Sequence, residues 1–184
     1  RYGGTDKILY DVGANIGLYS LYAAKRYPGM RVDVFEPLAA NWKALQHNFK
    51  LNDCYASVYP IALSNADGWA CLEPPHPVRG QTCTISHASM GTVRVRSLDT
   101  LVGDGMTCPT MIKIDVDGHE ERVVYGASQT IRNPRLETIL VELTGDVRPV
   151  AAQLASAGFR VASTSHWMLR SASGLPIRNL VFAR

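Results

Sequence analysis

The 184-residue chain predicts an α/β fold in which helices cover both faces of a mostly parallel sheet. Short apolar runs rich in β-branched residues alternate with stretches whose apolar residues follow a helical period. Strand–helix–strand units at this spacing join as right-handed crossovers, and such crossovers build parallel sheets. In an open α/β sheet, ligands bind beyond the carboxyl ends of the strands. Acidic residues end four of the apolar runs, as expected for a functional rim: Asp11, Glu36, Asp115 and Glu142.

The spacing of apolar residues and the positions of proline and glycine define the expected elements in the first third of the chain. The run at 7–12 is short and apolar, and the helical stretch after it ends at the breaker pair Pro28-Gly29. Pro37 fits the first turn of a second helix, where its missing N–H costs nothing. The elements expected here are strands at 7–12, 31–36 and 57–63, and helices at 16–27 and from 37 to about 52.

Residues 64–96 interrupt the alternation. Asn65-Ala66-Asp67-Gly68 has the composition of a turn. The proline-rich stretch 73–81 fits neither a helix interior nor a central strand, because proline lacks the backbone donor. Residues 92–96 alternate as an edge strand would. We therefore expect one domain over 1–184 with a variable insert at 72–91, and we expect this insert and the loop at 164–178 to shape the substrate pocket.

The last third returns to the strand–helix alternation. Two continuous apolar runs, MIKIDV and ETILVEL, have the composition of buried parallel strands. The elements expected here are strands at 111–116, 137–143, 159–163 and 179–183, and helices at 119–131 and 149–157.

Composition excludes few functions. Apolar residues make up 46% and charged residues 19% of the chain, and the formal net charge is +3. This scattered charge does not support nucleic-acid binding, which usually needs a clustered basic face. No apolar run would span a membrane and no leader-like segment opens the chain, so we expect a cytoplasmic protein. The four cysteines contain no CxxC pair, which argues against a cysteine zinc site and fits reduced thiols.

The stretch DVGANIGLYS, residues 11–20, occupies the first strand-to-helix junction. Gly13 and Gly17 would let a ligand approach the backbone, where the helix presents free amides. Tight packing of helix on strand is the alternative explanation. Asn15 stands where a dinucleotide fingerprint has its middle glycine, which argues against a pyrophosphate. Asp11 would likewise repel a phosphate but could receive an ammonium, directly or through water.

A second carboxylate narrows the choice of cofactor. Glu36 ends the second predicted strand, 19 residues beyond Gly17. A carboxylate at that position can bind both hydroxyls of a ribose. An adenosine that carries a cationic amino-acid tail suits Glu36 and Asp11 together. The predicted cofactor is therefore S-adenosyl-L-methionine.

Asp115, Asp117 and His119 follow the fourth predicted strand within five positions. A base placed there could accept the proton of a hydroxyl as it is methylated. The structural alternatives are a helix cap for His119 and a turn residue for Asp117. A divalent metal held by these three residues and Glu142 is a second possible mechanism. We expect transfer without a metal.

Four further side chains receive interpretations from their surroundings in the sequence. Lys113 lies inside a strand run and should pair with a nearby carboxylate. Glu120 fits a helix first turn, where the dipole favours a negative charge. Trp69 and Trp167 lie in irregular stretches and could stack on a sugar ring.

Six segments then carry a resemblance to a known family. They are DVGANIGLYS (11–20), VFEPLAANWKALQHNF (34–49), IALSNADGWA (61–70), VRVRSLDTLV (93–102), MIKIDVDGHEERVVYGA (111–127) and ILVEL (139–143). In order and spacing, over about residues 7–145, the chain resembles the FkbM family of S-adenosylmethionine-dependent methyltransferases. DxGAxxGxxS is widespread among class I methyltransferases, whereas IKIDV-acid-G-x-E followed by GA is much more specific.

The resemblance implies a Rossmann-like class I methyltransferase fold, a mostly parallel seven-stranded sheet with an antiparallel last strand. It also implies methyl transfer to a hydroxyl of a sugar or natural product. By position, Glu36 would hold the ribose, and Ala62 and Leu63 would flank the adenine. The complete set of implied cofactor-binding residues is Asp11, Gly13, Asn15, Gly17, Ser20, Glu36, Ala62 and Leu63.

The chain departs from the family pattern in two places. Asp117 stands where the family usually has glutamate, which shortens a possible catalytic arm by one methylene. The chain also begins at Arg1, only six residues before the first predicted strand, whereas family proteins commonly have more ahead of it. We therefore expect a trimmed chain or a piece of a longer protein, with some substrate contacts outside it.

Two functions from other classes stay open. A non-catalytic methyltransferase-like domain would bind the cofactor or a partner protein without turnover. An NAD-dependent oxidoreductase would need the dinucleotide fingerprint that Asn15 interrupts. The expected partner is a small-molecule or saccharide hydroxyl acceptor, and the sequence indicates neither its identity nor an oligomeric state.

Overall fold

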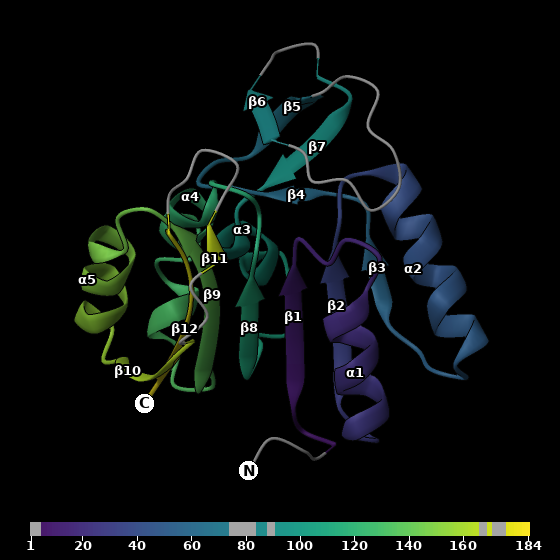
Figure 1. Cartoon of the computed structure of the whole chain (residues 1–184), viewed down its shortest axis with the longest axis horizontal. Coiled ribbons are helices and arrows are strands. Elements are labelled where there is room, and N and C mark those ends of the chain that lie inside the picture. The colour runs from purple at the N-terminus through teal and green to yellow at the C-terminus, as the bar shows by residue number, and fades with distance from the viewer. Residues whose placement is uncertain (1–4, 74–83, 88–90, 166–168, 171–175) are drawn as a thin grey trace.

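The computed structural model describes residues 5–73, 84–87, 91–165, 169–170 and 176–184. Strands and helices alternate through most of this range, as the periodicity predicts (Figure 1). In chain order the elements are β1 (Ile8–Val12), α1 (Leu18–Arg26), β2 (Arg31–Phe35), α2 (Ala39–Leu51), β3 (Ser57–Tyr59), β4 (Ala62–Leu63), β5 (Gly68–Glu73), β6 (Thr84–His87), β7 (Val93–Arg96), α3 (Leu98–Gly103), β8 (Met111–Ile114), α4 (Glu120–Tyr125), the 3₁₀ turn η1 (Thr130–Arg132), β9 (Thr138–Thr144), α5 (Arg148–Ser156), β10 (Arg160–Thr164), β11 (Leu169–Arg170) and β12 (Pro176–Ala183).

The large sheet runs in the order β10-β12-β9-β8-β1-β2-β3, and the short strand β11 pairs with β12 beside this path. The five strands from β9 to β3 pair in parallel. The last long strand, β12, pairs antiparallel with both β9 and β10. This confirms the predicted Rossmann-like class, with a mostly parallel sheet and an antiparallel last strand.

Each face of the large sheet has its own apolar core. On β1, Ile8, Tyr10 and Val12 join a cluster that includes buried residues of α4 and α5. On β2, Val32 and Val34 point the other way and join a cluster with buried residues of α1 and α2. Because side chains alternate along a strand, α1 and α2 cover one face while α4 and α5 cover the other. The prediction of helices on both faces is confirmed.

The third predicted strand, 57–63, is wrong as a single element. Pro60 has no N–H to continue the ladder, so β3 ends at Tyr59 and the chain turns away. β4 then opens a second sheet in the order β4-β7-β5-β6. Figure 1 shows this small sheet above the carboxyl ends of β1 and β2. β7 pairs with both β4 and β5, so the stretch 92–96 forms an inner strand of it and not the predicted edge strand.

Part of the expected insert at 72–91 belongs to the small sheet. β5 extends to Glu73 and β6 covers Thr84–His87, so part of the insert is regular structure. These two strands pair antiparallel with each other. The proline-rich stretch 74–83 lies outside the described residues, as does most of the predicted loop at 164–178.

Two helical elements differ from the prediction. α3 was not expected, although Ser97 caps it by accepting a hydrogen bond from the Thr100 amide at 3.1 Å. The helix predicted at 119–131 ends at Tyr125 and resumes as η1. Gly126 stands at this break, where a Cβ would lie 2.0 Å from the Ser64 carbonyl oxygen, so only glycine fits this close approach.

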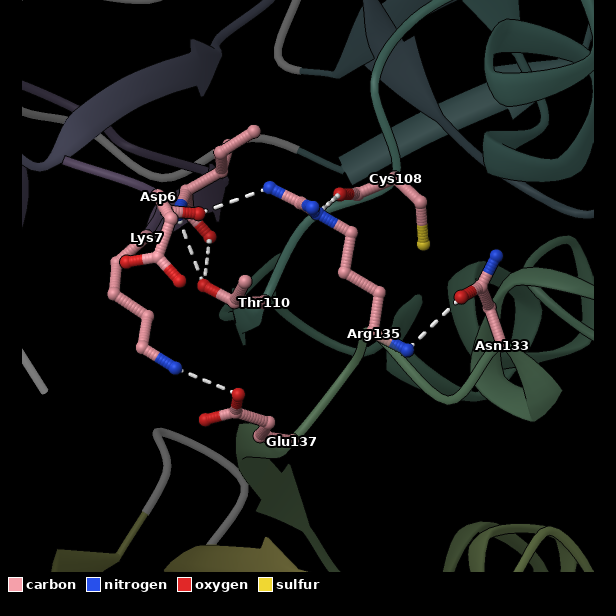
Figure 2. Close-up of polar contacts among 8 residues, drawn as sticks. Asp6, Lys7, Cys108, Thr110, Asn133, Arg135 and Glu137 are labelled. Atoms are coloured by element: carbon pink, nitrogen blue, oxygen red, sulfur yellow. Dashed lines mark hydrogen bonds and ion pairs between the residues drawn. The ribbon is translucent and has the colours of Figure 1, made fainter. Parts of the chain in front are cut away.

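Polar contacts tie together the amino-terminal ends of β1, β8 and β9 (Figure 2). The Lys7 ammonium lies 2.6 Å from a carboxylate oxygen of Glu137. The Thr110 hydroxyl accepts from the Ile8 amide at 2.9 Å. The Arg135 guanidinium donates to two backbone carbonyl oxygens, each at 2.9 Å. These bonds fix the end of the sheet that lies opposite the acidic rim.

Two sequence expectations concern the whole chain. Within the described ranges, no helix has the length and apolar character needed to cross a membrane. Among the cysteines in those ranges, Cys54, Cys71 and Cys108 are free thiols. Cys83 lies outside them.

Candidate active site

A pocket opens where the carboxyl ends of the large sheet meet the small sheet. Its walls come from the first two strand–helix turns, from the segment that includes β4, from β5 and from the loop between β8 and α4. It holds all three predicted catalytic residues and five of the eight predicted cofactor residues. These lining residues are Gly13, Asn15, Glu36, Ala62, Leu63, Asp115, Asp117 and His119.

Asp11 lies beneath the first turn and does not line the pocket. Its side chain is fully buried, and one carboxylate oxygen accepts from the Ser20 hydroxyl at 2.5 Å. The other oxygen lies 3.1 Å from the Lys113 ammonium. The structure thus places Asp11 and Ser20 behind the pocket wall, together with Gly17. Their geometry fits a role in holding the turn; a direct contact with the cofactor stays a prediction.

The two glycines of the first turn are explained by packing of the chain against itself. A Cβ on Gly13 would lie 1.9 Å from the Asp115 carbonyl oxygen. A Cβ on Gly17 would lie 2.6 Å from Cγ of Leu45 on α2. Both glycines also have positive φ, of 75° and 84°, a conformation that L side chains disfavour. The packing alternative therefore accounts for both positions, while Gly13 also lines the pocket.

Glu36 is fixed from three directions at one end of the pocket. The residue is 6% exposed, and its two carboxylate oxygens accept from the amides of Asn15 at 2.8 Å and Leu38 at 2.9 Å. The Asn41 side chain also hydrogen-bonds to it. Burial raises the pKa of Glu36, and these hydrogen bonds oppose that shift. A carboxylate offers about four lone-pair positions, so Glu36 remains a rigid acceptor that can receive a hydrogen bond from a ligand hydroxyl.

Apolar side chains line the pocket beside Glu36. Ala62 and Leu63 come from β4, and Leu72 comes from β5 of the small sheet. Val116 lines the pocket from the loop after β8. A flat aromatic ring suits such a wall, because its burial is favourable and its edge can remain near polar groups.

The loop between β8 and α4 is held in an unusual conformation. Asp117 and Gly118 both have positive φ, of 53° and 94°. Glu120 folds back under them, and one of its oxygens accepts from the amides of Val116 at 3.1 Å and Gly118 at 3.0 Å. Glu120 lies in the first turn of α4, as predicted. It is also buried and accepts hydrogen bonds from the loop amides, so it holds the loop in addition to its favourable interaction with the helix dipole.

Asp117 titrates near neutrality at the pocket. Desolvation of its carboxyl by the surrounding pocket, followed by the negative charges of Asp115, Glu120 and Glu142, raises the pKa of Asp117 to about 6, although the residue as a whole is exposed. The Lys113 ammonium opposes this shift. Asp117 is exposed, whereas His119 is half-buried at the N-cap of α4. A carboxyl that changes charge near pH 6 beside a histidine is a suitable arrangement for accepting a proton.

Lys113 links the first turn to the loop after β8. Its ammonium lies 3.1 Å from Asp11 and 3.2 Å from Asp115, which confirms the predicted pairing. Burial alone would lower the pKa of Lys113, but the two carboxylates outweigh burial and raise it. Tyr19 covers the same ammonium, with the ring centroid 4.9 Å away. Sequence analysis did not single out Tyr19, since only the fold shows that it faces β8.

The remaining candidates do not join the pocket. Among the described residues, no group of three or more His, Cys, Asp or Glu side chains is placed to hold a metal ion. The set proposed for a metal mechanism, which adds Glu142 to the predicted catalytic residues, therefore does not converge. Trp69 is 46% exposed and packs on Arg94. Trp69 lies three positions before Leu72 on β5, so its side chain points to the opposite face of the strand and away from the pocket. Trp167 lies outside the described residues.

A family model and two curated relatives agree on one family for this chain. Residues 11–161 match the family model described as the methyltransferase FkbM domain. The hexuronic acid methyltransferase AglP of Haloferax volcanii is 29% identical over 147 residues, which cover 78% of this chain and 59% of that protein. The 31-O-demethyl-FK506 methyltransferase FkbM of Streptomyces tacrolimicus is 25% identical over 192 residues, covering 85% of this chain and 74% of that protein.

A solved structure supports the fold. The crystal structure of the methyltransferase FkbM from Methylobacillus flagellatus KT superimposes with a TM-score of 0.67 at 17% sequence identity. The match covers 100% of this chain and 44% of that one. The chain thus spans less than two thirds of the length of this structure and of the Haloferax volcanii relative.

Proposed function

The chain belongs to the methyltransferase FkbM domain family, and on that premise we propose that it is an S-adenosyl-L-methionine-dependent O-methyltransferase. The proposed acceptor is a hydroxyl of a sugar or of a natural-product small molecule. One observation carries the proposal: a single pocket has a rigid, buried carboxylate, Glu36, at one place and the group Asp115, Asp117 and His119 at another. The names of two relatives, which refer to hexuronic acid and to FK506, support this range of acceptors.

The residues of the pocket fit the cofactor. Glu36 would accept hydrogen bonds from the two ribose hydroxyls, and its fixed orientation lowers the entropic cost of binding. Ala62 and Leu63 would contact the adenine, and Asp115 would face the amino-acid part. When bound, S-adenosyl-L-methionine supplies an electrophilic methyl group. The chain itself has to orient the acceptor hydroxyl in line with that methyl and to exclude water.

Asp117 and His119 are the two groups that could accept the hydroxyl proton. Both line the pocket, and both stand on the loop that Glu120 holds. In the proposed step, the O–H bond of the acceptor breaks as the new O–CH₃ bond forms. The proton passes to a carboxylate oxygen of Asp117 or to an imidazole nitrogen of His119. We expect the barrier to be lowered mainly by the placement of the acceptor hydroxyl, and to a smaller extent by the transfer of its proton to the base.

Turnover tests this function directly. We expect that incubation with S-adenosyl-L-methionine and a panel of glycosides and hydroxylated natural products releases S-adenosylhomocysteine and gives one product heavier by a single methylene. Asp117→Asn together with His119→Gln should abolish product while S-adenosylhomocysteine still binds. Cofactor binding with no turnover on any acceptor would instead favour the non-catalytic alternative.

A further inference from the structure

We propose that Tyr19, Glu142 and Asn179 form the acceptor subsite, and that this subsite binds a polyhydroxyl ring with no negative charge beside the methylated hydroxyl. This inference rests on the proposed function, because it assumes that the reacting methyl lies near Asp115. It adds the place and the charge class of the acceptor. The evidence is the register of the sheet, the exposure of three side chains and the charges around them.

Strand register places the subsite on the face that α1 covers. Lys113 of β8 pairs with Asp11 on one side and with Leu140 on the other. Paired residues point their side chains to the same face of a sheet. Glu142 lies two positions after Leu140 and therefore shares its face. It pairs with Asn179 of β12, which extends this polar row across the ends of β8, β9 and β12.

Tyr19 provides one side of the subsite. It is 55% exposed on α1, and its ring lies over the Lys113 ammonium. The helix α1 packs on β1 and β2, as Figure 1 also shows, so it leaves the ends of β9 and β12 uncovered by its own side chains. Glu142 and Asn179 are half-buried there. Lys113 connects this surface to the pocket, because it contacts the pocket-lining Asp115 at 3.2 Å.

The chemistry of these side chains suits a sugar-like ring. The Asn179 amide donates to one carboxylate oxygen of Glu142 at 3.0 Å, which fixes both groups in one orientation. Within the described residues, the other Glu142 oxygen and the Asn179 amide oxygen make no hydrogen bond. They could accept from neighbouring hydroxyls of a polyol. The Tyr19 ring offers an apolar face and a hydroxyl, a combination suited to the C–H side and the edge of a ring.

The charge around the subsite selects against acids. Ile114 of β8 pairs with Val141 of β9, so the next residues along the two chains, Asp115 and Glu142, lie opposite each other. Asp117 stands on the adjoining loop. The Lys113 ammonium is already shared between Asp11 and Asp115. A carboxylate or phosphate on the acceptor would lie against this negative surface. Repulsion between like charges about 4 Å apart in water-like surroundings lowers affinity roughly three- to tenfold. The expected acceptor therefore differs in charge from the hexuronic acid in the name of the Haloferax volcanii relative.

A nuclear magnetic resonance titration with a matched pair of ligands tests the inference. The ¹⁵N-labelled chain is first saturated with S-adenosylhomocysteine, then titrated with methyl α-glucopyranoside or with methyl α-glucuronide. We expect the neutral glycoside to shift the amide signals of residues 19, 142 and 179 and to bind at least about threefold tighter than the uronide. Glu142→Gln should bring the two affinities closer together, because it removes one of the negative charges that repel the uronide, and Tyr19→Ala should weaken both ligands.

The control is Glu137→Gln, which removes a carboxylate from the opposite end of β9. It should change neither affinity, since Glu137 pairs with Lys7 far from the rim. Equal or tighter binding of the uronide, shifts confined to other residues, or no response to either glycoside would overturn the inference. Those outcomes leave the proposed function standing as long as S-adenosylhomocysteine shifts the pocket signals. Failure of S-adenosylhomocysteine to bind would count against the proposed function itself.

Discussion

Replacing Lys113 by methionine should destabilise the fold far more than the same replacement of a surface lysine. Lys113 has 9% of its side chain exposed, and its ammonium is shared by Asp11, which is 1% exposed, and Asp115. Lys113→Met keeps most of the length of the side chain but leaves the Asp11 carboxylate buried with no cation. Removing one partner of a buried ion pair costs about 3–5 kcal/mol. We therefore expect Lys113→Met to remove about that much from the free energy of unfolding.

Lys7→Met is the matched control for this prediction. Its ammonium lies 2.6 Å from a Glu137 oxygen, closer than either contact of Lys113, but Glu137 is 49% exposed. Exposed pairs contribute about 1 kcal/mol or less. Urea unfolding at pH 7, followed by circular dichroism, measures both variants. The double variant Lys113→Met with Asp11→Asn should recover most of the loss, because it removes the orphaned charge. Equal costs for Lys113→Met and Lys7→Met would refute the reasoning.

Three further predictions concern the turn and the loop. Gly13→Ala should unfold or strongly destabilise the chain, since its Cβ would lie 1.9 Å from the Asp115 carbonyl oxygen; an unchanged melting temperature would contradict this. If Asp117 is the base, the transfer rate should rise with pH through about 6, because only the ionised carboxylate accepts a proton, and Asp117→Asn should remove that limb from the pH–rate profile. Glu120→Gln should move the limb to lower pH, because it removes a negative charge that raises the pKa of Asp117, whereas Glu121→Gln should leave it in place.

Local sequence signals predicted the parallel sheet and the part of the site that follows from it. Glu36 could be placed because it ends a strand at a fixed distance from the first turn, and strand ends converge on one rim. Asp115, Asp117 and His119 could be placed on the same grounds. Two missed features also had local signals. Pro60 marks the end of β3, and the Ser97 hydroxyl caps α3.

Long-range contacts could not be read from the sequence. The local pattern predicts that Asp11 contacts the cofactor, but it does not show that Asp11 is buried beside Lys113, which is about a hundred residues away in the chain. The explanation for Gly13 likewise depends on the Asp115 backbone. Tyr19 gains its position only because α1 packs on β1 and β2, which brings its ring over Lys113 of β8. In each case one local pattern fits two environments, and the tertiary fold selects between them.

Calorimetric titration with S-adenosylhomocysteine tests the central claim most directly, with NAD⁺ in parallel and Glu36→Gln as the variant. Asp33→Asn is a suitable control, since Asp33 is a buried acid of β2, the strand that Glu36 follows. Its charge partner is Arg31, and it does not line the pocket. The account predicts binding of S-adenosylhomocysteine alone, weakened at least tenfold by Glu36→Gln and little by Asp33→Asn in the folded protein. Binding of NAD⁺ instead, or S-adenosylhomocysteine binding that is indifferent to Glu36, would contradict it.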